Sequence, residues 1–146
     1  AFADQRHESS VLSWKVLFPD KSINEMSSKQ INYSISSALK EINPDIVFAG
    51  ALAFPSGAGA LKWKHKTSKP IVVFDDARPQ DVVRPWYINK LKQLFYKNVD
   101  AVFCPAPSHA EGYTFWGLNK ESIFYGLDVV NNQLFEPKDN DIFNRS

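Results

Sequence analysis

Cysteine, long apolar runs and excess charge of either sign are all scarce in this sequence. One cysteine among 146 residues excludes a disulfide within the chain, and the apolar run Ala101–Cys104 predicts a buried thiol in a reducing compartment. No apolar stretch approaches the roughly 20 residues of a membrane-spanning helix. Seventeen basic side chains against sixteen acidic ones leave no positive excess for binding nucleic acid. We therefore expect a cytoplasmic protein with one hydrophobic core and no nucleic-acid partner.

Recognisable metal and phosphate motifs are absent as well. The three histidines, His7, His65 and His109, are too scattered for a metal site of known spacing. The sequence has no Gly-x-x-x-x-Gly-Lys-Ser/Thr, which excludes a P-loop. The basic residues bunched between Lys62 and Lys69 predict a solvated helix end, or else a weak phosphate or membrane-surface contact. We expect neither a metal ion nor a cofactor.

Glycine is infrequent, but one pair stands where a strand meets a helix. Gly57-Ala58-Gly59 is followed about 20 residues later by two aspartates, as in dinucleotide-binding domains. Lys62 occupies the place of the third glycine of that motif, so a dinucleotide-binding Rossmann domain is kept only as an alternative. For the small residues of the stretch Ser56–Ala60 we favour another role: they let a helix pack close to the sheet, or let a sugar approach the backbone.

Short apolar runs alternate with helical patterns along the whole chain. The predicted strands are Ser13–Phe18, Asp45–Gly50, Ile71–Phe74, Asp100–Cys104 and Ser122–Tyr125. Runs without polar alternation indicate parallel strands that are covered on both faces, and right-handed crossovers then place the connecting helices against the sheet. The predicted fold class is α/β, a Rossmann-like three-layer sandwich with a mostly parallel sheet of about five strands.

Several helix boundaries can be predicted from capping residues. Ser27 with Gln30 forms a capping box before the first helix, and Ser108 with Glu111 predicts a second one. Gly117 is expected to end the helix that begins at Ser108. A further helix, expected around Ala58–Lys66, precedes the third strand. After Pro85 an apolar stripe recurs at helical spacing, and we expect it to face the core: Ile88, Leu91, Leu94 and Phe95.

Two adjacent carboxylates, Asp75 and Asp76, directly follow the predicted strand Ile71–Phe74. In parallel sheets ligands bind outside the carboxyl ends of the strands, so this acidic pair lies where chemistry is expected. We expect both carboxylates to be little buried and to act in catalysis rather than in stability. The alternative is structural, with one aspartate capping a turn and pairing with Arg78.

The segment Asn98–Pro137 contains several elements whose order and spacing can be compared with those of known families. A strand, DAVFCP, precedes a helix, SHAEGYTFWG; then follow Gly-x-x-x-x-x-Ile, a strand ending in Gly126-Leu127-Asp128, and Phe135-Glu136-Pro137. In order and spacing this resembles the end of the N-terminal domain of group 1 glycosyltransferases with the GT-B fold. The phrases LKEINPDIV and KPIVVFDD extend the resemblance upstream to Leu39.

The resemblance implies a division of the protein into domains. Residues 1–137 would form the N-terminal, acceptor-side half, and residues 138–146 would begin the interdomain linker or a tail. The donor-binding domain would lie outside this chain, so the chain alone is expected to fold but to transfer no sugar. The intact enzyme would move a sugar from a nucleotide-sugar donor to a hydroxyl acceptor. A membrane surface is a further partner that the sequence leaves open without supporting it.

The resemblance also implies roles for particular residues. The two aspartates would be catalytic, although the family often has a histidine in this loop. The residues expected to bind the acceptor are Ser56, Gly57, Arg78, Ser108 and His109. Gly126 and Asp128 would border the cleft between the domains.

A non-catalytic α/β binding module, such as a receiver domain, is an alternative of another class. Receivers need acidic residues after the first strand and a lysine after the fifth. Here Pro19-Asp20 follows the first predicted strand and Gly126 follows the fifth. The sequence therefore favours an enzyme half over a receiver.

Overall fold

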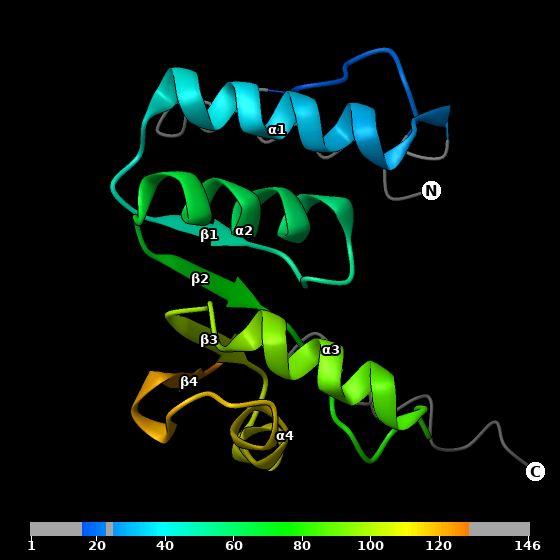
Figure 1. The fold of residues 1–146 in the computed structure, drawn as a ribbon, viewed down its shortest axis with the longest axis vertical. Coiled ribbons are helices and arrows are strands. Elements are labelled where there is room, and N and C mark those ends of the chain that lie inside the picture. The colour runs from blue at the N-terminus through cyan, green and yellow to red at the C-terminus, as the bar shows by residue number, and fades with distance from the viewer. Residues whose placement is uncertain (1–15, 23–24, 129–146) are drawn as a thin grey trace, which may run out of the picture.

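The structure, a computed structural model, describes residues 16–22 and 25–128. Its strands are β1 (Val47–Ala49), β2 (Ile71–Phe74), β3 (Ala101–Cys104) and β4 (Ile123–Tyr125). Its α-helices are α1 (Ser28–Ile42), α2 (Pro55–Thr67), α3 (Trp86–Tyr96) and α4 (Ala110–Phe115). Two 3-10 turns, η2 (Pro107–His109) and η3 (Lys120–Ser122), complete the element order (Figure 1). No helix among the described residues is long and apolar enough to cross a membrane.

The four strands form one parallel sheet in the order β1-β2-β3-β4. The predicted α/β, Rossmann-like fold is confirmed, with four strands rather than about five. The predicted strand Ser13–Phe18 lies partly outside the described residues, and its described part, residues 16–18, is not a strand. The predicted linker, residues 138–146, and Phe135-Glu136-Pro137 lie wholly outside them.

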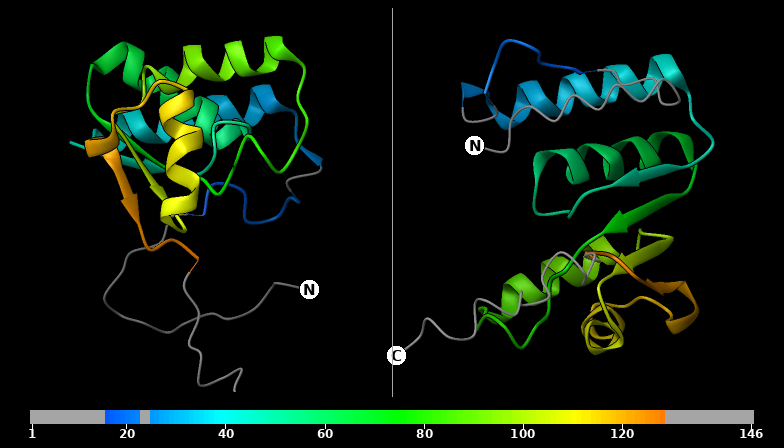
Figure 2. Two further views of the ribbon diagram at one scale, coloured as in Figure 1. Left: turned by 90° about the horizontal axis from the view of Figure 1, so that it is seen from below. Right: turned by 180° about the vertical axis from the view of Figure 1, so that it is seen from behind.

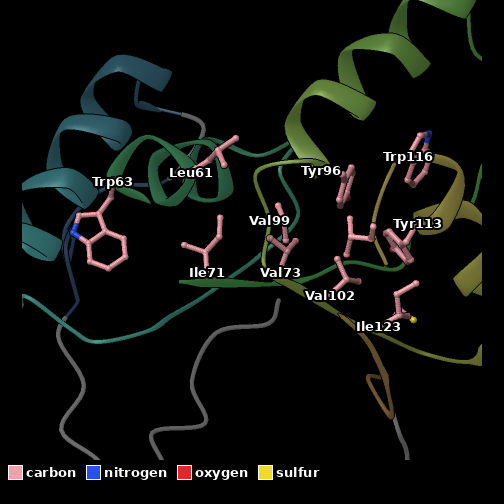
Figure 3. Close-up of a cluster of buried hydrophobic side chains, with 12 residues drawn as sticks. Leu61, Trp63, Ile71, Val73, Tyr96, Val99, Val102, Tyr113, Trp116 and Ile123 are labelled. Atoms are coloured by element: carbon pink, nitrogen blue, oxygen red, sulfur yellow. The ribbon is translucent and has the colours of Figure 1, made fainter. Parts of the chain in front are cut away.

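One face of the sheet carries the hydrophobic core. Alternate strand residues, among them Ile71, Val73 and Val102, are fully buried against side chains from α2, α3 and α4 (Figure 3). Three large aromatic rings fill the space beside them, and Tyr96 stacks on Trp116 with the ring centroids 5.4 Å apart. The core therefore lies directly beneath the helices that follow the strand ends.

The other face of the sheet presents one phenylalanine from each strand: Phe48, Phe74, Phe103 and Phe124. Successive rings are in contact, with centroid distances of 5.7, 5.8 and 6.4 Å. Three of these rings are exposed, Phe48 at 57%, Phe74 at 36% and Phe124 at 49%. In the described part of the chain this face is therefore open, unlike the cover on both faces that the continuous apolar strands predict.

Helix α1 packs on α2 rather than on the sheet, and the two run side by side in Figures 1 and 2. Gly59 makes this approach possible, because a Cβ there would lie 3.2 Å from Asn32 Oδ1 and from Ile35 Cγ2. The predicted packing role of the glycine pair is therefore correct for Gly59, although its neighbour is a helix and not the sheet.

Some helix boundaries were predicted correctly and others were wrong. The capping box of Ser27 and Gln30 is present at the start of α1, and Gly117, with φ +104°, follows α4 as expected. The second capping box is wrong: η2 starts at Pro107, and neither η2 nor α4 has a side-chain cap. Proline, with its fixed φ, is favoured at the first helical position, so the turn begins at Pro107 with Ala106 as its N-cap, and Ser108 lies inside the turn.

The apolar stripe predicted for α3 does not face the core. Leu91, Leu94 and Phe95 are exposed, and the buried residue of the helix is Tyr96. The inward side of α3 instead carries polar groups, Asn89, Gln93 and the hydroxyl of Tyr96.

Candidate functional site

The carboxyl ends of the strands meet at one edge of the sheet, as parallel pairing requires. The N–H of Asp75, just after β2, donates to the carbonyl of Phe103 at 3.2 Å. The N–H groups of Gly126 and Leu127, just after β4, donate to the carbonyl of Cys104 at 3.1 and 3.3 Å. The ends of three strands are thereby tied together around the end of β3.

Asp75 is buried, contrary to the expectation that both carboxylates are little buried. Its side chain continues the inward alternation of Ile71 and Val73, and the residue is 5% exposed. Its Oδ1 accepts the N–H of Ala77 at 3.0 Å, and its Oδ2 accepts the hydroxyl of Tyr96. Burial of a carboxylate is tolerated because these donors replace water.

The two tyrosines hold Asp75 from both its side chain and its backbone. Tyr113 in α4 donates its hydroxyl to the Asp75 carbonyl at 2.6 Å, while Tyr96 in α3 donates to the carboxylate. Burial raises the pKa of both phenols, and the negative charge of Asp75 raises it further. Both phenols therefore stay protonated at neutral pH and remain hydrogen-bond donors.

Asp76 is the exposed member of the pair. It points away from the core, because adjacent residues at a strand end alternate in direction. Within the described part of the chain no hydrogen bond or ion pair engages its carboxylate, whereas that of Asp75 is fully engaged. The structure thus separates the pair into an anchored carboxylate and an open one.

Arg78 is paired with Asp81 within the loop that follows β2. Its Nε and Nη2 both donate to the Asp81 carboxylate, and this contact lowers the pKa of Asp81. Arg84 donates to the carbonyl of Arg78 at 3.0 Å. Arg78, which is expected to bind the acceptor, therefore already makes a two-pronged contact with Asp81, and its predicted pairing with the Asp75-Asp76 pair is not present.

The loop after β2 also lies against the start of α4. A Cβ on Gly112 would come within 2.5 Å of Pro79 Cδ, so the two segments touch. His109 is close enough for its charge to influence Asp81, and its Nδ1 lies 3.3 Å from Ser108 Oγ. Ser108 and His109 are thus brought to the same edge as the loop after β2.

Ser56 and Gly57 lie in the first turn of α2, after β1. A Cβ on Gly57 would lie 2.4 Å from the Ala51 carbonyl oxygen and 2.6 Å from that of Gly50. Gly57 is therefore needed for backbone packing. Ser56 is exposed at this end of the sheet.

Gly126 and Asp128 form the turn after β4. Both have positive φ, +111° and +58°, a conformation that glycine and aspartate adopt more readily than most residues. Both are exposed at the carboxyl edge, which leaves their predicted place beside an interdomain cleft as a prediction.

A cavity of about 170 Å³ opens beside Asp75, between α3 and the loop after β1. Its lining is mostly apolar: Leu52, Ala53, Asp75, Ile88, Leu91, Lys92, Phe95 and Tyr96. Lys92 Nζ lies 4.0 Å from the centre of the Trp116 ring, an attractive contact between a cation and a π-system. Burial lowers the pKa of Lys92, and the positive charge of Arg84 lowers it further, while Asp75 raises it.

Lys92, Tyr96 and Tyr113 are site residues that the sequence did not single out. Their helices were predicted, but nothing in the spacing marks two tyrosines as partners of one aspartate. The alternation of side chains along β2 did contain a usable signal. Asp75 stands two residues after Val73 and four after Ile71, so its side chain points to the same buried face and must find hydrogen-bond donors there.

Cys104 is fully buried, as predicted, and burial raises its thiol pKa. Among the described residues no group of three or more histidine, cysteine or acidic side chains could hold a metal ion.

Two solved structures share the fold of this chain. One is a protein assigned as a UDP-N-acetylglucosamine 2-epimerase from Listeria monocytogenes, with a TM-score of 0.50 and 19% identity, covering 71% of this chain and 28% of that protein. The other is MnaA from S. aureus in complex with UDP, with a TM-score of 0.51 and 16% identity, covering 79% of this chain and 34% of that protein.

These likenesses show a GT-B-like, Rossmann-type fold. This chain spans only about a third of the length of these two proteins or less. No protein-family model matches the sequence, and no curated protein does. The narrower resemblance to group 1 glycosyltransferases stays a prediction.

Proposed function

We propose that this chain is the acceptor-side half of a two-domain enzyme that uses a nucleotide sugar, and that the enzyme is a glycosyltransferase. The observation that carries the proposal is the split acidic pair at the carboxyl end of β2. One carboxylate, Asp75, is buried and anchored, which holds the other, Asp76, open to solvent above the sheet. The fold likeness to a protein solved with UDP supports the nucleotide-sugar class.

In this proposal Asp76 is the catalytic residue. An acceptor hydroxyl must lose its proton as its oxygen bonds to the anomeric carbon of the donor sugar. The carboxylate of Asp76 takes that proton, and the nucleoside diphosphate leaves with the electron pair of the broken glycosidic bond. A general base in hydrogen-bond reach contributes about 10²–10⁴ in rate.

Asp75 is then a positioning residue. Its Oδ1 fixes the N–H of Ala77, the second residue after it, and so defines the turn on which Asp76 sits. Arg78 Nη1 has no hydrogen-bond partner among the described residues, and with Ser108 and His109 it completes the acceptor side. Gly126 and Asp128 would face the donor-binding domain.

A second candidate is epimerisation of a nucleotide sugar, because the listerial structural neighbour carries that assignment. The two candidates differ in products. A transferase releases the nucleoside diphosphate and forms a glycoside, while an epimerase returns an intact nucleotide sugar with one inverted carbon.

The test uses the protein in which this chain is joined to its donor-binding domain. UDP-sugars labelled in the sugar are incubated with and without candidate hydroxyl acceptors, and the products are separated. Asp76→Asn should lower turnover about 10²–10⁴-fold without changing the melting temperature. The matched control is Asp45→Asn, an exposed aspartate just before β1, at the opposite edge of the sheet, with a Lys69 contact at 3.7 Å.

The outcomes separate the candidates. Formation of a labelled glycoside supports a glycosyltransferase. Inversion of one sugar carbon in the nucleotide sugar, without any acceptor, supports an epimerase instead. Full activity of Asp76→Asn removes this residue from the mechanism, with Arg78, Ser108 and His109 as the next to replace. Sugar transfer by the 146-residue chain alone would refute the division into two halves.

A further inference from the structure

The outward face of α3 is apolar and aromatic. We call Val83, Trp86, Tyr87, Leu91 and Leu94 the α3 face. Val83 is 100% exposed, Trp86 76% and Leu94 61%. At 100° per residue, the four helical members lie on one half of the helix, and the exposed Lys90 lies on the same half, between Trp86 and Leu94. Ordinary surface helices show the opposite arrangement, with the apolar side inward.

The apolar residues of α3 face outward because its inward side is occupied by polar contacts. Asn89 accepts the indole N–H of Trp116 at 3.3 Å, and Gln93 donates to the Phe115 carbonyl at 3.1 Å. Lys92 lies over the Trp116 ring, and Tyr96 donates to Asp75. The outward apolar residues are therefore not needed for the core.

The charge around the α3 face is positive. From Val82 to Val99 the sequence contains four basic residues and no acidic one. Lys90 and Lys97 are exposed, while Arg84 and Lys92 are half-buried beside the Trp116 ring. The aspartates at either end of this stretch form ion pairs with basic residues outside it. Asp81 is bound by Arg78, and Asp100 by Lys64.

From this placement we propose that the α3 face binds the surface of an anionic lipid bilayer, with α3 lying in the plane of the interface. Interfacial helices combine an apolar side with flanking lysines or arginines. Tryptophan and tyrosine favour the headgroup level of a membrane, where Trp86 and Tyr87 would sit. Exposed Lys90 and Lys97 would meet lipid phosphates.

The size of the face favours a bilayer over a protein partner. An 11-residue helix is about 16 Å long. At the roughly 10 Å diameter of a helix, such a strip covers about 160 Å², well below the roughly 800 Å² per partner that stable protein complexes bury. A bilayer needs no matched surface, and the lysines add attraction to its negative charge.

The test is vesicle co-sedimentation of the 146-residue chain, with vesicles of phosphatidylcholine alone or with added phosphatidylglycerol. Binding should require the anionic lipid and weaken with salt. Lys90→Gln with Lys97→Gln should lower the affinity roughly 25-fold, about fivefold for each charge. Lys62→Gln with Lys66→Gln, on the other basic cluster, should leave it within about twofold.

A second pair of variants tests the apolar contribution. Leu94→Ser should lower the affinity about tenfold, while Ile42→Ser, 60% exposed on α1, should not. Thermal melts confirm that each variant is folded. The proposal is overturned by absence of binding to anionic vesicles, by equal loss in the Lys62/Lys66 variant, or by a dimer in light scattering that Leu94→Ser converts to a monomer. The test measures no sugar chemistry, so it stands apart from the proposed function.

Discussion

The hydroxyl of Tyr96 can be removed with little other change, by Tyr96→Phe. The ring keeps its stack on Trp116, at 5.4 Å, and only the hydrogen bond to Asp75 Oδ2 is lost. Hydrogen bonds to charged groups contribute about 1.5–3 kcal/mol, and the loss leaves a buried carboxylate oxygen without a donor. We expect the free energy of unfolding to fall by about 2 kcal/mol. For a domain of this size that lowers the melting temperature by roughly 6–10 °C.

The assay is urea unfolding followed by circular dichroism, with two comparison variants. Tyr113→Phe removes a hydrogen bond to the neutral Asp75 carbonyl and should cost about 1 kcal/mol. Tyr125→Phe, on an exposed residue of β4, should cost nothing measurable. If Tyr96→Phe is no less stable than Tyr125→Phe, the Asp75 carboxylate is not anchored by Tyr96 and the division of roles between the two aspartates fails.

Three further predictions follow from burial and close packing. Burial raises the pKa of Tyr96 and Tyr113 above the ordinary value near 10, so the folded state holds these protons more tightly than the unfolded state. Stability should therefore fall above about pH 10, by up to ~1.4 kcal/mol per pH unit for each tyrosine. Urea unfolding at rising pH checks this, and an equal fall of stability with pH in the double phenylalanine variant contradicts it. Gly57→Ala should cost roughly 1–3 kcal/mol by thermal melt, whereas Gly50→Ala, with 3.9 Å of room, should be near neutral; equal stability would refute the clash. Because Cys104 is buried, it should react with a thiol reagent only in denaturant. Rapid labelling of the native chain would show instead that the thiol is exposed to solvent.

The strands were predictable because their signal is local. Ile71–Phe74 forms the strand predicted, and the other three observed strands lie within their predicted ranges. Each is a short apolar run bounded by residues that stop it, which requires no knowledge of distant contacts. Parallel order then followed from the intervening helices.

The site was predictable in place but not in detail. The sequence located Asp75 and Asp76 at a strand end, and the structure brings Ser108 and His109 to the same edge. It could not reveal that Asp81, three residues after Arg78, takes the arginine. That pairing depends on a loop conformation, and loops carry no periodicity from which to read it.

The orientation of α3 was the largest error, and its cause lies in β2. Helical periodicity reports that Leu91 and Leu94 share a face, but not which way the face points. Because Asp75 has the parity of the buried Val73, its carboxylate must enter the core beneath α3 and must meet a donor there. Tyr96 supplies that donor, and turning Tyr96 inward turns the leucines outward. The same buried charge therefore fixes the acidic pair, the polar inner side of α3 and the apolar surface that α3 shows to solvent.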